Sequence, residues 1–254
     1  MKKRKAGIGI FVIVLIITAV RVKSMDSHRI SGRILAENIA GPGMLRLVEQ
    51  SMQARARKTS VTEIAVKERK HPQAALTFDD GPDIRYTPLL LDGLKERNVR
   101  VSFFLLGEKV EQYPELVERM QKEGHLVGNH TYHHVQLNKL NETKAREEIL
   151  KTNNLIYETT GVYPLYLRPP FGAWKKNLEL CVEMLPVFWT IDTLDWKVQN
   201  TEKIVRTVQE QIEDGAIILM HDEYDTSVEA ALQVVDELKN QGYELVTVDQ
   251  LILP

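Results

Sequence analysis

The sequence predicts an α/β domain with a parallel sheet, arranged as a distorted or shortened (β/α) barrel over residues 71–254. From residue 74 onward, short apolar runs alternate with longer segments that carry apolar residues at three- and four-residue spacing. This pattern gives six to seven strand–helix units, fewer than the eight of a complete barrel, which typically takes about 250 residues. An open, doubly wound sheet is the less favoured alternative.

The expected elements alternate along the chain. We expect strands at residues 74–78, 101–106, 126–128, 165–167, 187–191, 216–220 and 245–248. We expect helices at residues 87–97, 114–123, 141–159, 177–184, 201–213 and 227–240. Several of the helices are closed by Gly or Asn, which favour helix ends.

Polar residues stand directly after most of these strands. They are Asp79 and Asp80 after the first strand, Asn129 and His130 after the third, Arg168 after the fourth, Asp192 and Asp195 after the fifth, and His221 and Asp222 after the sixth. Because the C-terminal ends of parallel strands meet at one rim of a barrel, these side chains are expected to line a single pocket.

The N-terminal sequence predicts an export signal or a membrane anchor. Four basic residues at positions 2–5 precede an uncharged run over residues 6–20. As a helix this run would be about 22 Å long, which is shorter than the ~30 Å hydrocarbon core and is typical of a cleaved signal peptide. The run is rich in Ile and Val and lacks a convincing cleavage site, so an uncleaved signal-anchor is favoured.

The anchor hypothesis divides the chain into three parts. Residues 1–24 would form a cytoplasmic basic cluster and a single membrane-spanning helix, residues 25–70 an extracytoplasmic stalk, and residues 71–254 the main domain. The protein would then lie in the cell membrane with its main domain outside, or be secreted if the N-terminal segment is cleaved.

Charge and cysteine content exclude several classes of protein. Residues 71–254 carry 18 Lys and Arg against 30 Asp and Glu, so the main domain would be repelled by phosphate backbones and nucleic acid is not an expected partner. Cys181 is the single cysteine, so a metal site must be built from His, Asp and Glu.

Two neighbouring carboxylates and a histidine cluster suggest a catalytic metal site. Asp79 and Asp80 lie where a strand becomes a turn, so one can bind a metal while the other acts as a base. His130 is followed by histidines three and four positions later, and residues four apart share a face if this loop enters a helix. Spacing alone leaves open whether His133 or His134 partners His130.

A second group of residues suggests proton transfer. Arg168, ahead of two prolines, can keep a carboxylate ionised, and a histidine oriented by an aspartate, as His221 would be by Asp195, can donate a proton. Taken singly, the Arg168 segment is better explained as a structural loop with a surface ion pair, and the Asp and His segments are as consistent with a helix-capping Asp and a core His as with a catalytic role.

Five segments in this order resemble the polysaccharide deacetylases with a NodB homology domain, carbohydrate esterase family 4. The segments are residues 77–82, 130–134, 168–172, 192–196 and 219–222, and the resemblance covers roughly residues 72–250. It implies a distorted (β/α) barrel and metal-dependent removal of acetyl groups from N-acetylated amino sugars in polymers such as peptidoglycan or chitin.

The resemblance also implies roles for individual residues. Asp79 matches the catalytic base, His221 the general acid, and Arg168 and Asp195 the residues that position them. The metal ligands implied are Asp80, His130 and His134. Phe171, where the family commonly has Tyr, matches a backbone N–H that stabilises the oxyanion, and Leu219 a wall of the acetyl pocket.

The expected function is therefore hydrolysis of an acetamido group on a cell-envelope polysaccharide. The cofactor is a divalent metal, with zinc expected and cobalt, nickel or manganese as alternatives. Trp196 and Trp174 lie near the rim, where an indole can stack on a sugar ring or pack in the core. The alternatives are a hydrolase of a small non-sugar amide and an anchored glycan-binding protein without turnover. The oligomeric state stays open.

Overall fold

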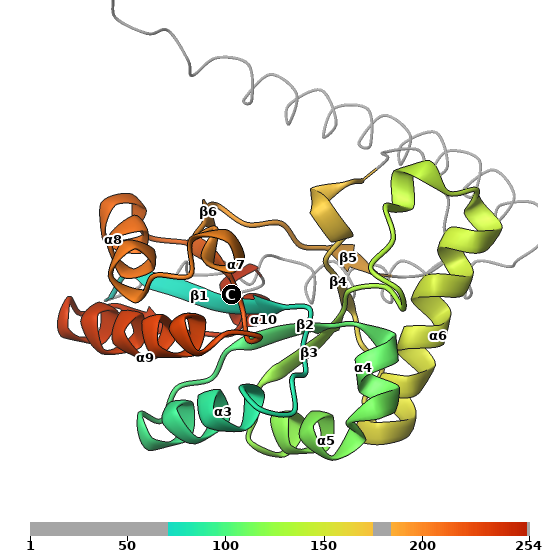
Figure 1. Cartoon of the computed structure of the whole chain (residues 1–254), viewed down its shortest axis with the longest axis horizontal. Helices are drawn as coiled ribbons and strands as arrows, with labels where there is room; N and C mark the ends of the chain where they lie inside the picture. Colours follow the sequence, from blue (N-terminus) through green and yellow to red (C-terminus); the bar gives the residue numbers. More distant parts are fainter. Residues whose placement is uncertain (1–70, 175–183, 253–254) are drawn as a thin grey trace, which may run out of the picture. The chain divides into compact units, whose positions relative to one another are not determined.

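A curved sheet of parallel strands forms the centre of the domain (Figure 1). The computed structural model describes residues 71–174 and 184–252, and in this part of the chain the strand order is β5-β4-β3-β2-β1-β7-β6, with β8 also paired to β1. The strands are β1 (Gln73–Asp79), β2 (Ser102–Leu105), β3 (Leu126–Asn129), β4 (Tyr166–Leu167), β5 (Leu185–Pro186), β6 (Ile191–Asp192), β7 (Ala216–His221) and β8 (Glu244–Leu245). All described strand pairs are parallel, as predicted.

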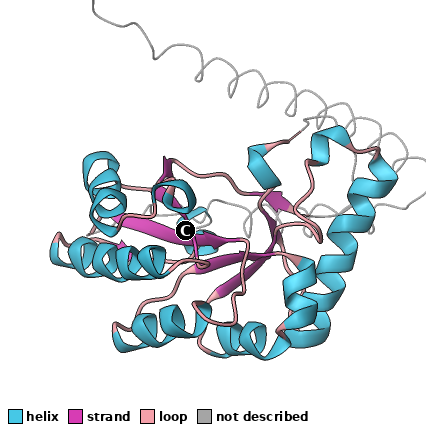
Figure 2. Cartoon of the chain, in the orientation of Figure 1, coloured by secondary structure: helices cyan, strands magenta, loops and turns pink. Residues whose placement is uncertain are grey.

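Helices cover the outer face of this sheet, and Figure 2 shows them in a layer around the strands. The described helices are α3 (Thr87–Glu96), α4 (Gly107–Gln112), α5 (Pro114–Lys122), α6 (Glu142–Thr160), α7 (Asp195–Val198), α8 (Thr201–Gln211), α9 (Asp225–Asn240) and α10 (Val248–Ile252). The longest, α6, begins at Asn141, whose side chain accepts a hydrogen bond from the Lys144 amide, and ends at Gly161 with φ of 73°. Its capping residues therefore set its length.

The central strand β1 shows how the alternation of side chains builds both the core and the site. Leu76 and Phe78 pack into the large apolar cluster shared with the helices. The intervening residues Thr77 and Asp79 point to the opposite, inner face, because successive side chains of a strand alternate. The inner face thus carries buried polar groups at the C-terminal end of β1.

The sheet is a half-barrel among the described residues, which confirms the parallel α/β fold and the distorted barrel. The strand expected at residues 187–191 is wrong, because only Ile191 of this run lies in a strand. The run begins just after β5, which pairs with β4, with the Val187 amide still bonded to the Leu167 carbonyl, and it ends in β6, which pairs with β7. The residues between them cross the open side of the half-barrel and cannot pair with both edges.

Other expected elements differ at their ends. Helices α4, α7 and α10 were not predicted, because elements of four to six residues are too short for a clear helical period. The strand expected at 245–248 is shortened to β8, since Val248 begins α10.

The expected helix at 177–184 falls outside the described residues apart from Met184, as do Cys181 and the expected anchor and stalk at residues 1–70. Within the part described, no helix is long and apolar enough to span a membrane.

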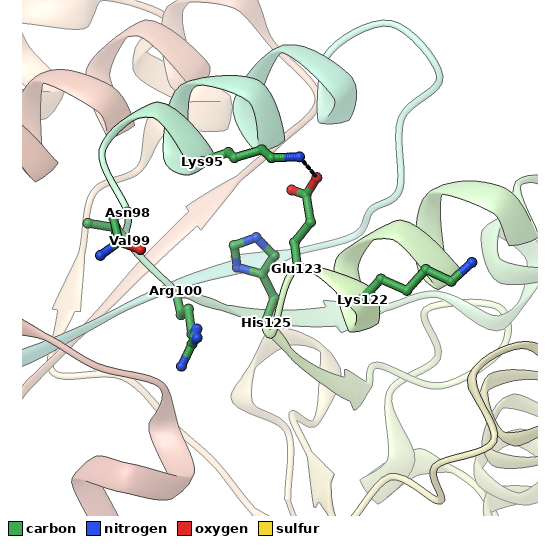
Figure 3. A pocket seen from close by; sticks show the side chains of 7 residues that line it. All are labelled: Lys95, Asn98, Val99, Arg100, Lys122, Glu123 and His125. Atoms are coloured by element: carbon green, nitrogen blue, oxygen red, sulfur yellow. Dashed lines mark hydrogen bonds and ion pairs between the residues drawn. The ribbon is translucent and has the colours of Figure 1, made fainter.

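His125 lies at the end of the strands opposite to the predicted rim, directly before β3. Figure 3 shows its ring in a hollow with the Lys95–Glu123 ion pair above it. The ring is buried, with 4% of the residue exposed, and its Nδ1 accepts a hydrogen bond from the Val101 amide at 3.1 Å. Burial lowers the pKa of His125 to about 4, so the imidazole is neutral in the folded protein.

His125 is expected to make the protein less stable in mild acid. The unfolded chain binds the proton near pH 6.5 and the folded chain only near pH 4, so stability is full above pH 6.5 and falls as pH decreases toward 4. Between pH 7 and pH 5 the loss is about 2 kcal/mol. Urea unfolding of the wild type and of His125→Asn at both pH values measures this loss of stability. The Asn side chain keeps a hydrogen-bond acceptor for the Val101 amide. An equal loss in the variant would contradict this role.

Candidate active site

The two neighbouring aspartates at the end of β1 diverge. Asp79 is the last residue of β1 and is 3% exposed, while Asp80 has φ of 70°, in the left-handed region that few residues other than glycine adopt. This turn gives the two carboxylates different partners. Asp79 faces Arg168, whereas Asp80 faces His130 and His134.

Arg168 crosses the inside of the half-barrel to reach Asp79. It is fully buried, and its Nη1 donates to Asp79 Oδ1 at 2.7 Å and to Thr77 Oγ1 at 2.6 Å. Its guanidinium carbon lies 4.2 Å from the centre of the Phe104 ring and 5.8 Å from that of Trp189. These contacts fix the guanidinium beside the carboxylate and keep water out.

Burial dominates the electrostatics of this pair. It raises the pKa of Asp79, and the charge and hydrogen bond of Arg168 oppose the shift without cancelling it. A carboxylate with a raised pKa is a stronger proton acceptor than one on the surface. Asp79 therefore combines a fixed orientation with the basicity that proton abstraction requires.

Asp80, His130 and His134 form a group that can hold a metal ion. One ligand atom of each lies within 4.8 Å of the others, and Asp80 Oδ1 is 3.5 Å from His130 Nε2 and 3.4 Å from His134 Nε2. Ligands about 2.1 Å from a tetrahedral ion are separated by roughly 3.4 Å. Asp80 Oδ1 is buried and has no hydrogen-bond partner among the described residues, as expected for an oxygen that faces a cation. The residues present fit a divalent metal.

His130 is prepared to act as a ligand. Its Nδ1 lies 2.6 Å from the Arg168 carbonyl oxygen, so Nδ1 carries the proton and Nε2 is left free toward Asp80. Burial lowers the pKa of His130 to about 3, which keeps the ring neutral. Only a neutral imidazole can bind a metal.

The loop of residues 130–134 is not helical, so its histidines do not share a helix face. Thr131 and His134 have φ of 67° and 55°, and the loop folds back so that the rings of His130 and His134 lie 5.1 Å apart. His133 points away, with 58% of its side chain exposed and Nδ1 2.8 Å from Glu148. The structure therefore brings His134, and not His133, to Asp80.

His221 and Asp195 form a second pair beside the metal group. Asp195 is fully buried and accepts two hydrogen bonds at 2.8 Å, one from the His221 amide and one from its Nδ1. This leaves His221 Nε2 facing the site, 3.8 Å from Asp80 Oδ2. Burial lowers the pKa of His221, but the bond to Asp195 and the charges of Asp195, Asp79 and Asp80 outweigh it and raise this pKa to about 9.

Of the three residues expected to contact substrate, Phe171 contacts the metal group, and Leu219 and Trp196 lie on the elements that carry His221 and Asp195. Phe171 has φ of 60°, is 62% exposed, and places its ring 4.5 Å from that of His134. Leu219 is buried on the inner face of β7, two residues before His221, and Trp196 in α7 is 49% exposed. Trp174 packs against the cluster around Leu167, which favours its core role.

Sequence reasoning missed the residues that support the site from a distance. Thr77 and Trp189 contact Arg168, and Glu148 in α6 accepts from the loop that carries His134. None of them lies at a rim position with an obvious chemical role. Thr77, inside the motif before Asp79, is the one that its position could have indicated.

The fold and the site define a class: a parallel (β/α) half-barrel with an Asp/His/His metal group and a buried Asp–Arg pair at the C-terminal ends of its strands. Residues 66–187 match the family described as Polysaccharide deacetylase. The solved structure of the peptidoglycan deacetylase PdaC from Bacillus subtilis is similar, with a TM-score of 0.70 and 42% identity, covering 72% of this chain and 91% of that one. This chain belongs to the polysaccharide deacetylase family, carbohydrate esterase family 4, and the resemblance seen in the sequence is confirmed.

Two curated relatives extend the comparison. The peptidoglycan-N-acetylglucosamine deacetylase PgdA of Listeria monocytogenes is 42% identical over 185 residues, which is 73% of this chain and 40% of that protein. The peptidoglycan-N-acetylmuramic acid deacetylase PdaC of Bacillus subtilis is 43% identical over 177 residues, 70% of this chain and 38% of that protein. The chain thus spans about 40% of the length of these relatives.

Proposed function

We propose that this chain is a metal-dependent deacetylase that hydrolyses acetamido groups of N-acetylated amino sugars in peptidoglycan. The observation that carries the proposal is that two neighbouring aspartates at the end of β1 have different partners. Asp79 is held by Arg168, while its neighbour Asp80 lies with two histidines in a metal group. The names of both curated relatives support peptidoglycan as the substrate, one specifying N-acetylglucosamine and the other N-acetylmuramic acid.

The metal would be held by Asp80, His130 and His134, with zinc as the proposed ion and cobalt, nickel and manganese as alternatives. When bound, a divalent ion supplies a Lewis acid for the acetyl carbonyl and lowers the pKa of water from 15.7 toward roughly 7. Three protein ligands leave a coordination position open, which is typical of a catalytic site.

Asp79 would take the proton from the attacking water. Its Oδ1 is bonded to Arg168 and its Oδ2 lies 3.7 Å from His130 Nε2, so the carboxylate is fixed beside the metal group. The Phe171 backbone N–H would donate to the oxyanion that develops on the acetyl group. A single donor of this kind is worth roughly 3 kcal/mol of transition-state stabilisation.

His221 would donate a proton to the departing sugar amine. An amine is a poor leaving group, so amide hydrolysis needs an acid as well as a base. Asp195 holds the imidazole with Nε2 toward the site and favours its protonated form. Trp196 and Phe171 would offer exposed rings to the sugar units, and Leu219 would form a wall of the acetyl pocket.

His221→Ala is expected to lower the rate on an acetamide more than on an acetate ester. The alcohol of an ester leaves more easily than an amine, so its departure depends less on a donated proton. Metal content should stay unchanged, because His221 is not in the metal group. Rates of acetate release from a matched amide and ester measure the difference. Equal losses on the two substrates would show that His221 is not the acid.

Acetate release from purified substrates tests the proposed function. We expect release from peptidoglycan, with mass analysis of its digested fragments showing which sugar has lost the acetyl group. Preference for chitin oligomers would redirect the substrate to another N-acetylglucosamine polymer. Cleavage of small acetamides alone would support the non-sugar hydrolase, and glycan binding without acetate would support the non-catalytic alternative.

We propose also that residues 1–24 anchor the protein as a single-pass membrane protein, with residues 25–70 as a stalk and the catalytic domain outside. The basic cluster, the apolar run and the lack of a good cleavage site support this. A chain that starts near residue 70 is expected to be soluble and active, because all the site residues lie beyond that point. A mature protein that starts near residue 25 and washes freely from membranes would contradict the anchor.

A further inference from the structure

The loop that carries His134 is held by the carboxylate of one residue in α6. Glu148 Oε2 accepts hydrogen bonds from the Tyr132 amide at 3.1 Å and from the His133 amide at 2.9 Å. Its Oε1 lies 2.8 Å from His133 Nδ1. The Glu148 side chain is 16% exposed, so these bonds are largely shielded from water.

The two amides that Glu148 binds lie between two strained residues. Thr131 and His134 both have positive φ, a conformation that is unfavourable for a non-glycine residue and persists only where the surrounding structure enforces it. The bonds to Glu148 fix the backbone between these two positions. They are therefore placed to determine where the His134 side chain goes.

Other contacts hold the ends of the loop: the Val135 amide, directly after His134, donates to Thr131 Oγ1 at 3.2 Å, and the remaining bonds lie at its start. The Asn129 side chain accepts from the Thr131 amide at 2.6 Å, and the Gly107 amide donates to the Thr131 carbonyl at 3.0 Å. Beyond Thr131, Glu148 is the side chain that binds the amides of Tyr132 and His133, directly ahead of His134. His130 has its own support, since its Nδ1 contacts the Arg168 carbonyl.

The geometry points to Glu148 as a positioning residue for the metal site: by accepting from the Tyr132 and His133 amides, it holds the loop in the conformation that brings His134 Nε2 to 3.4 Å from Asp80 Oδ1. Glu148 contacts neither the metal position nor the substrate and acts through the backbone. This inference rests on the proposed function, because it assumes that Asp80, His130 and His134 bind a metal.

The test measures metal affinity in the purified full chain, by competition for zinc with a chromogenic chelator. Glu148→Ala removes the acceptor and is expected to raise the Kd for zinc by about 10- to 100-fold. Glu148→Gln keeps an oxygen for the two amides and is expected to restore the Kd to within a few-fold of wild type. Glu147→Ala, an exposed glutamate one position earlier on the same helix, is the matched control and should leave the Kd unchanged.

A second readout follows the ligand geometry itself. The visible absorption of bound cobalt depends on the arrangement of its ligands, so Glu148→Ala should change this spectrum while Glu148→Gln and Glu147→Ala retain the wild-type spectrum. Should Glu148→Ala not fold, Glu148→Met replaces it, because Met keeps the apolar length of the side chain and suits a helix. The same rise in Kd is expected.

The outcomes separate this inference from the proposed function. A wild-type Kd and cobalt spectrum in Glu148→Ala or Glu148→Met would overturn the role of Glu148 and leave the metal site intact. Loss of affinity in Glu148→Gln equal to that in Glu148→Ala would also overturn it, because charge and not the acceptor oxygen would then matter. A wild-type chain that binds neither zinc nor cobalt would overturn the metal site and this inference together.

Discussion

Asp79→Asn is expected to lower kcat by a factor of about 10² to 10⁴ while the metal stays bound, the loss typical of a missing general base. The side-chain amide of the introduced Asn cannot accept the proton from water, whereas the metal ligands Asp80, His130 and His134 are unchanged. Acetate release and metal content are measured on the same preparation. Excess metal should give no rescue, because an added ion cannot replace a proton acceptor.

The partner of Asp79 requires a control for folding. Asp79→Asn leaves the buried Arg168 guanidinium without its carboxylate, and an unpaired buried charge commonly costs roughly 3 to 5 kcal/mol of stability. Circular dichroism at the assay temperature distinguishes a folded, inactive variant from an unfolded one. A folded Asp79→Asn that hydrolyses the acetamide at the wild-type rate would show that Asp79 is not the base.

The second large effect concerns the metal group. His130→Ala and His134→Ala are expected to lose bound metal and activity together, and Asp80→Asn to bind metal more weakly with partial rescue by excess ion. His133→Ala is the matched control and should keep both metal and activity. The His133 ring faces Glu148, and the hydrogen bond from the His133 backbone amide to Glu148 remains when the ring is removed. Loss of metal in His133→Ala and not in His134→Ala would reverse the choice of ligand.

The parts of the site that the sequence predicted are those set by a strand end. Asp79, His130, Arg168 and His221 each lie at or directly after a strand of a parallel sheet, so the topology alone brings them to one rim. The same alternation of apolar runs and helical segments predicted most of the fold. Short elements such as α7 were not predicted, because a single helical turn is too short to show a hydrophobic period.

The rest depends on contacts between distant parts of the chain. Spacing could not choose between His133 and His134, because the loop takes its shape from Glu148 in α6 and from Asn129. The run at 187–191 is apolar enough for one strand, yet it crosses between two edges of the sheet. Only the tertiary structure decides such cases.

The most direct test of the central claim is acetate release from peptidoglycan before and after removal of the metal. The proposed mechanism predicts that the purified protein releases acetate and exposes free amines in equal amounts, that exhaustive chelation stops both, and that added zinc restores both. Undiminished release from protein in which no metal can be detected would contradict the account.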